Sequence, residues 1–201
     1  MCVHHWGLQG FRFLCGPVFI DTGLKMTTQE AITKVREILL ARYANYWQLE
    51  GKERVVLAAS VLADDIKVRE TSNNHGEWVE AILGAVNLPG GYPWCAALIE
   101  FCCDVAKYEA GPSDRASAAV DSWYQWAKAN GRITDKPERG YLCLWRRAGG
   151  NHIGIINQAG RAILDSIEGN TTPGVVGNQR DGGGCYRRTR SKTSWTHFIA
   201  L

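Results

Sequence analysis

The sequence predicts an α+β fold in which a helical first part is followed by an antiparallel sheet. Apolar residues recur at helical spacing through the first part, while the second part consists of short apolar runs separated by glycine-containing turns. The chain has 201 residues, 45% of them hydrophobic, so it is long enough to bury one core. We expect helices near 28–44, 53–66, 75–86, 95–109 and 116–129 and strands near 141–146, 152–158, 161–167, 185–190 and 195–200.

Caps, turns and apolar spacing mark the predicted helices. Thr28 is a plausible cap for the first of them. The Pro89-Gly90-Gly91 turn separates the third helix from the fourth, which begins abruptly at Cys95. In the fifth helix, we interpret Trp123 and Trp126 as core residues rather than as a platform for a sugar.

Cys95 is the first candidate for a functional residue. It follows the Gly90-Gly91 turn and Pro93, and it stands in the first turn of the predicted fourth helix. Backbone N–H groups and the helix dipole at that end favour a thiolate, which is the reactive form of cysteine. A small buried core residue is an equally good interpretation of a cysteine here, so the position alone leaves both readings open.

The predicted hairpin around Ala159-Gly160 supplies polar partners for such a thiol. Its first strand opens with His152, and its second strand ends at Glu168-Gly169-Asn170. A Cys–His catalyst needs a thiolate, a proton shuttle and a group that fixes the tautomer of the imidazole. We therefore expect His152 to act as the base, with Glu168 favoured over Asn170 as the group that orients it.

Three segments carry a family resemblance: Tyr92-Pro93-Trp94-Cys95-Ala96-Ala97, His152-Ile153-Gly154-Ile155 and Ile167-Glu168-Gly169-Asn170. In this order they resemble the signature blocks of the CHAP domain, the cysteine, histidine-dependent amidohydrolase/peptidase family. The resemblance implies a papain-like fold, with the nucleophile at the N-terminus of a helix that packs on an antiparallel sheet. It also implies a Cys95 nucleophile, a His152 base and a Glu168 orienting residue, with Asn170 as a second candidate.

The resemblance further implies an enzyme that cleaves an amide bond of peptidoglycan, as phage lysins and bacterial wall hydrolases do. The backbone N–H of Cys95 is one donor for the oxyanion, and the hydroxyl of Tyr92 is a candidate for the second, although Tyr92 could equally be a packed aromatic of the turn. We expect Tyr92 and Trp94 to contact substrate. The chain lacks the aspartate-rich loop of calcium-binding members, so we predict no metal and no cofactor.

The sequence divides into three segments: 1–25, 26–67 and 68–201. The first has no sustained period and is interpreted as a mis-called extension before a start at Met26. The second is expected to be a helical extension, and the third the CHAP-like catalytic domain. Near the start of the third segment, Glu70, Asn73 and Asn74 either line the cleft or cap a helix.

The net charge and the cysteine content indicate which partners and which cellular compartment fit this protein. The formal net charge of +3 is too small to argue for a nucleic-acid partner. The run Arg187–Lys192 and the segment Trp145-Arg146-Arg147 are interpreted as solvated strand faces rather than as sites for an anionic wall polymer. The seven cysteines form no CxxC pair, which fits synthesis in a reducing compartment. Four of them are expected in the core: Cys102, Cys103, Cys143 and Cys185.

The chain shows neither a membrane span nor a signal peptide. We therefore expect a protein without membrane insertion that is made in the cytoplasm and reaches the cell wall after release, as a phage or prophage lysin does. We also expect a monomer. One alternative is a Cys–His protease, deamidase or acyltransferase that acts on a protein, as a toxin or effector. A second alternative is an inactive wall-binding module, which is disfavoured because all three polar positions are present.

Overall fold

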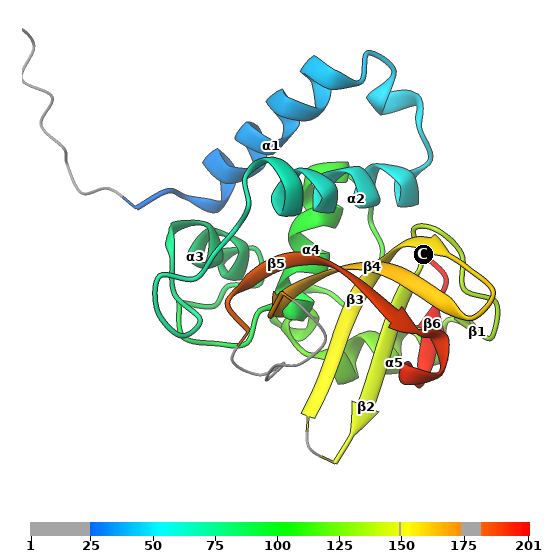
Figure 1. The fold of residues 1–201 in the computed structure, drawn as a ribbon. Coiled ribbons are helices and arrows are strands. Elements are labelled where there is room, and N and C mark those ends of the chain that lie inside the picture. The colour runs from blue at the N-terminus through cyan, green and yellow to red at the C-terminus, as the bar shows by residue number, and fades with distance from the viewer. Residues whose placement is uncertain (1–24, 149, 174–181) are drawn as a thin grey trace, which may run out of the picture.

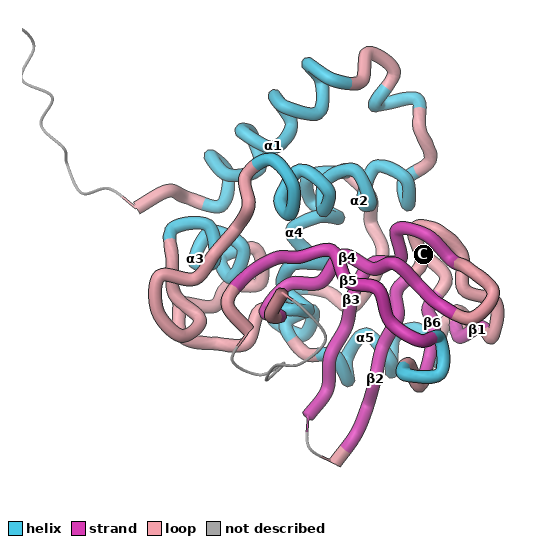
Figure 2. The backbone as a smooth tube through the Cα atoms, in the orientation of Figure 1, coloured by secondary structure: helices cyan, strands magenta, loops and turns pink. Residues whose placement is uncertain are grey.

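The computed structural model describes residues 25–148, 150–173 and 182–201, in which helices are followed by one antiparallel sheet (Figure 1 and Figure 2). The α+β class predicted from the sequence is therefore confirmed. The helices are α1 (Thr28–Arg42), α2 (Gly51–Ser60), α3 (Glu77–Gly84), α4 (Cys95–Ala106) and α5 (Val120–Ala129). The strands are β1 (Ile133–Thr134), β2 (Leu142–Arg147), β3 (Gly150–Ala159), β4 (Ile163–Thr171), β5 (Gly184–Ser191) and β6 (His197–Ile199). The predicted extension 1–25 lies outside the described residues except for Lys25.

The cap of α1 is Thr27, so the prediction of Thr28 is wrong by one residue. The Thr27 hydroxyl accepts a hydrogen bond from the backbone N–H of Glu30 at 3.2 Å, and the Glu30 carboxylate accepts one from the N–H of Thr27 at 2.8 Å. This reciprocal pair is a capping box, which the three-residue spacing of Thr27 and Glu30 permits. Thr28 lies inside the helix, and its hydroxyl donates to the carbonyl oxygen of Ala81 in α3 at 2.8 Å.

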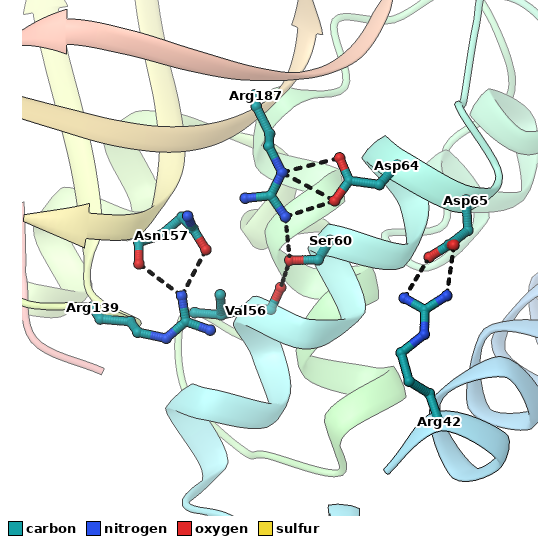
Figure 3. A network of polar contacts seen from close by, with 8 residues as sticks. All are labelled: Arg42, Val56, Ser60, Asp64, Asp65, Arg139, Asn157 and Arg187. Carbon is teal, nitrogen blue, oxygen red and sulfur yellow. Dashed lines mark hydrogen bonds and ion pairs between the residues drawn. The ribbon is translucent and has the colours of Figure 1, made fainter.

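Helix α2 continues into one π-helical turn that ties the helices to the sheet (Figure 3). Asp64 in this turn forms an ion pair with Arg187 of β5, with 2.6 Å between Oδ2 and Nη2. The next residue, Asp65, pairs with Arg42 at the end of α1 at 2.6 Å. The turn therefore connects α1, α2 and β5 through two neighbouring carboxylates.

Helix α4 begins at Cys95, as predicted, with Trp94 as its N-cap. It ends at Ala106, earlier than the predicted 109, because Lys107 takes a left-handed φ of 48° that a right-handed helix cannot continue. Helix α4 is central in the fold: it packs against β3 and β4 and against α1, α2 and α3 (Figure 1). The N-terminus of this helix is thereby fixed against the sheet.

The sheet has the strand order β1-β6-β2-β3-β4-β5 within the described residues, and all its pairings are antiparallel. The predicted hairpin is present as β3 and β4, with a bulge between Ile156 and Gln158. Strand β4 continues to Thr171, so Glu168 and Asn170 lie within it rather than after its end. The short β1 escaped prediction because two residues cannot show an alternating pattern.

One large hydrophobic core joins the helices to the sheet, and residues of α1 and α2 share it with α4, β3 and β4. Ile153 and Ile155 of β3 belong to this core. Because side chains alternate along a strand, His152 points to the opposite face. A smaller cluster that includes Cys143 and Trp195 lies on that face. The helices therefore pack on the sheet through the large core, while the smaller cluster lies on the other face.

The residues predicted for the core are buried. Trp123 is completely buried, and Trp126 is partly buried against the large core. The four cysteines assigned to the core are also buried, and they are Cys102, Cys103, Cys143 and Cys185. Among the described helices, none has both the length and the apolar character that crossing a membrane requires.

Candidate active site

Cys95 is a buried free cysteine at the first position of α4, with 6% of its surface exposed. His152 of β3 lies near it, because Cys95 is one of the groups whose interactions raise the pKa of His152. Two elements that are far apart in the sequence, a helix N-terminus and the beginning of a strand, therefore meet at this thiol. The helix end contributes a dipole that favours negative charge on the sulfur.

His152 links Cys95 to Glu168 on the neighbouring strand. Its Nε2 atom lies 2.9 Å from Oε2 of Glu168, and both side chains are almost completely buried. A carboxylate can only accept hydrogen bonds, so Nε2 carries a hydrogen. This leaves Nδ1 as the ring nitrogen that interacts with Cys95.

The surroundings of His152 favour its protonated form. Burial disfavours the charged imidazolium, but hydrogen bonds and charge interactions with Cys95 and Glu168 outweigh it and raise the pKa of His152 to about 9. A protonated imidazole between two groups that can both carry negative charge is the arrangement expected of an ion-paired Cys–His catalyst.

Glu168 is fully buried and accepts four hydrogen bonds. Oε2 accepts from His152 and from Nη2 of Arg190 at 2.7 Å, while Oε1 accepts from the hydroxyl of Ser166 at 2.6 Å and from Nε of Arg190 at 2.8 Å. Burial raises the pKa of this carboxyl, but the hydrogen bonds and charges of Arg190 and His152 prevail and hold it well below its usual range. Gly154 makes room for this side chain, because a Cβ atom there would lie 2.8 Å from Cγ of Glu168.

Asn170 does not occupy the position beside the imidazole. Its backbone has a left-handed φ of 51°. With the amide nitrogen turned toward the acceptors around it, Asn170 donates to Oε1 of Glu70 and to Oδ1 of Asn74, each at 3.2 Å, and to the carbonyl oxygen of Gly182 at 3.1 Å. Of the two orienting residues considered from the sequence, Glu168 is therefore the one in contact with His152.

Tyr92 and Trp94, both expected to contact substrate, differ in exposure. Tyr92 is 45% exposed, whereas Trp94 is completely buried and donates from Nε1 to Oε1 of Glu70 at 2.9 Å. The Trp94 ring lies against Gly169, where a Cβ atom would come within 2.8 Å of the indole. Trp94 therefore packs beneath the start of α4, and Tyr92 is the accessible member of the pair.

Glu70 and Asn74 are joined by a hydrogen bond close to the contact between Trp94 and Gly169. The second oxygen of the Glu70 carboxylate accepts a hydrogen bond from the backbone N–H of Asn74 at 2.9 Å. Glu70 thus holds the loop before α3 and the indole of Trp94 at the same time. Of the two sequence interpretations of Glu70, the capping role is wrong, because the N-cap of α3 is Gly76 and no side chain caps that helix.

Three further residues lie around the His152–Glu168 pair and were not predicted for the site: Trp145, Trp195 and Arg190. The prediction of solvated faces is correct for Arg187 and Arg147, which are exposed, but wrong for Arg188, Arg190 and Trp145: Arg188 is 5% exposed, the side chain of Arg190 is 13% exposed, and Trp145 is partly buried. The ring centroids of Trp145 and His152 are 4.9 Å apart, and those of Trp145 and Trp195 are 5.1 Å apart. Alternation along β5 was the available signal, because Arg188 and Arg190 are two residues apart and share a face.

Within the described ranges, no three His, Cys, Asp or Glu side chains gather in a group that could hold a metal ion. Comparisons of the chain with family models, with curated proteins and with solved structures give no match in any of the three.

Proposed function

We propose that this protein is a cysteine amidohydrolase or endopeptidase that cleaves an amide bond of peptidoglycan through an acyl-enzyme. The observation that carries the proposal is the contact series Cys95–His152–Glu168, in which a thiol at a helix N-terminus meets a buried imidazole held by a carboxylate. A central helix that packs on an antiparallel sheet also supports a papain-like arrangement.

The proposed reaction uses these three side chains in turn. The Cys95 thiolate attacks the amide carbonyl carbon, and the oxyanion that forms is stabilised by the backbone N–H of Cys95, with the Tyr92 hydroxyl as the candidate second donor. When the carbon–nitrogen bond breaks, the leaving amine takes a proton from His152. Water, deprotonated by His152, then attacks the thioester, releases the acid and restores the Cys95 thiolate beside the protonated His152. Glu168 keeps the imidazole in one orientation throughout.

The choice of peptidoglycan rests on the resemblance of the three sequence segments to CHAP domains. In the proposal, the protein is a phage or prophage lysin that is made in the cytoplasm and acts on the cell wall after release. The same three side chains serve an enzyme that acts on protein amides equally well, so the substrate is the part of the proposal that an experiment must decide.

The deciding experiment measures the turbidity of purified peptidoglycan and the masses of the released fragments. The wild type is expected to clear the suspension, and the fragment masses will identify the bond that is cut. Cys95→Ala is expected to leave the walls intact. Walls from several species that resist both proteins would reject the peptidoglycan substrate in favour of a protein substrate, and equal clearing by both would remove Cys95 from the mechanism.

The pH dependence of wall degradation is expected to report on His152. Since the pKa of His152 is raised to about 9, the imidazolium that protonates the leaving amine persists through neutral pH and is lost as the pH rises through about 9. The rate should therefore fall on the alkaline side of pH 9 rather than near the ordinary histidine value of about 6.5. Initial rates between pH 5 and 10, at constant ionic strength, test this; a decline centred near pH 6.5 would contradict it.

A further inference from the structure

Arg190 contacts both oxygens of Glu168. Nε donates to Oε1 at 2.8 Å and Nη2 donates to Oε2 at 2.7 Å, so the planar guanidinium meets the planar carboxylate at two points. Oε2 is also the atom that accepts from His152. The guanidinium therefore fixes the rotation of the same carboxylate that orients the imidazole.

The four side chains form a row in which the charges alternate. Cys95 on α4, His152 on β3, Glu168 on β4 and Arg190 on β5 are connected in this order, each to the next. With Cys95 as a thiolate, the formal charges run negative, positive, negative, positive and sum to zero. A buried carboxylate is costly unless it is paired and hydrogen bonded, and Arg190 supplies two of the four hydrogen bonds to this one.

Two tryptophan rings cover the outer end of this row. The Arg190 guanidinium lies 4.9 Å from the ring centroid of Trp145 and 5.8 Å from that of Trp195. The Trp145 ring also lies against His152, with an angle of 34° between the ring planes, and the two residues are opposite each other in the register of β2 and β3. These rings hold the guanidinium through cation–π contacts and keep water from the ion pairs, which strengthens them.

The groups that set the charge around Glu168 come from three strands. In order along the sheet they are Cys143 on β2, His152 on β3, and Cys185, Arg188 and Arg190 on β5. The pKa values of both cysteines are raised, chiefly by burial, so their thiols stay neutral. Arg188 donates to the carbonyl oxygen of Thr172 instead. Of the two arginines among these groups, Arg190 is therefore the one that binds the Glu168 carboxylate directly, from the strand on the other side of β4 from His152.

We propose that Arg190 is a positioning residue of the active site, which through its two-point contact holds the Glu168 carboxylate ionised and aligned and so supports the Cys95–His152 ion pair. This inference rests on the proposed catalytic role of Cys95. Loss of the Arg190 charge makes the site more negative, so formation of the Cys95 thiolate then requires a higher pH.

The test is the rate at which iodoacetamide alkylates Cys95 as a function of pH, with the labelled cysteine identified by peptide mass. In Arg190→Met, the acid midpoint of the alkylation profile is expected to move up by about one pH unit or more, and hydrolysis by an active wild type to fall by about 10²-fold. Arg187→Met is the matched control, because Arg187 is an exposed arginine of the same strand that pairs with Asp64. It should leave the alkylation profile of Cys95 unchanged.

Arg190→Lys keeps the charge without the planar fork, and it carries the test if the methionine variant does not fold. It is expected to reduce hydrolysis by about tenfold with a smaller movement of the profile. A profile for Arg190→Met that matches the wild type, or a lysine variant identical to the wild type in both measurements, would overturn the inference. Because alkylation needs no wall substrate, a wild type that leaves walls intact but shows the Arg190 effect would reject peptidoglycan as the substrate and retain the inference.

Discussion

Replacement of Cys95 by serine is expected to lower the rate of wall degradation by at least about 10⁴-fold while the protein remains folded. Serine has nearly the size of cysteine, so the start of α4 can keep its packing. Its hydroxyl is a far weaker nucleophile, and the His152 environment, which favours an imidazolium, is unsuited to act as a base toward an alcohol. Rates on purified peptidoglycan and circular dichroism spectra of both proteins provide the measurement.

Cys102→Ala is the matched control for that experiment. Cys102 lies seven residues after Cys95 on the same helix and is completely buried. Burial, and then the nearby Cys185 and Cys103, raise its pKa well above the usual range, so it is not a reactive thiol. We expect this variant to retain wall-degrading activity and to lose about 1 kcal/mol of unfolding free energy. If activity survived in Cys95→Ser and disappeared in Cys102→Ala, the nucleophile would be Cys102, and the role proposed for Cys95 would be wrong.

The elements that carry the candidate residues were predicted correctly where the sequence has local signals. A turn followed at once by helical spacing placed Cys95 at the start of α4, and turn residues on both sides of two apolar runs located the β3–β4 hairpin. His152 and Glu168 could then be assigned to neighbouring strands of the hairpin. These inferences depend only on residues within a few positions of each other in the chain.

The missing parts depend on contacts between distant segments. Arg190 was assigned to a solvated run because its partner Glu168 lies 22 residues earlier, on another strand. Glu70 binds the Trp94 indole across 24 residues, which no local pattern indicates. The left-handed backbone of Asn170 likewise takes its amide away from His152, and single-sequence reasoning has no access to that dihedral angle.

Replacement of Glu168 by alanine is expected to cost about 3–5 kcal/mol of unfolding free energy and most of the activity. It leaves the largely buried Arg190 without its carboxylate, and it removes the acceptor of His152 and of Ser166. The pKa of Glu168 is lowered in the folded protein, so its stabilisation is fully present above about pH 4.5, begins to decline below that value, and is lost as the pH falls through the lowered pKa. Urea unfolding at pH 7 and at pH 4 should therefore show a smaller difference between the proteins in acid.

The glutamine variant separates the charge of Glu168 from its shape. Both carboxylate oxygens accept hydrogen bonds from Arg190. In Glu168→Gln one of them is replaced by an NH₂ group, which is a donor, so in either orientation of the amide two donors face each other and one hydrogen bond to Arg190 is lost. The orientation with its oxygen toward His152 retains the imidazole contact, so this variant should be more stable than Glu168→Ala. Without the negative charge, the pKa of His152 falls below about 9, and the alkaline limit of activity moves down with it.

Asn170→Gly provides the comparison, because glycine accepts the left-handed backbone at this position and only the amide is removed. The contact between His152 and Glu168 is untouched in this variant, so the alkaline limit of activity should stay where the wild type has it. The two variants therefore show which residue orients His152, because only the variant of the orienting residue should move the alkaline limit of activity. A general loss of stability does not produce such a shift. A shift in Asn170→Gly together with an unchanged limit in Glu168→Gln would assign the orienting role to Asn170.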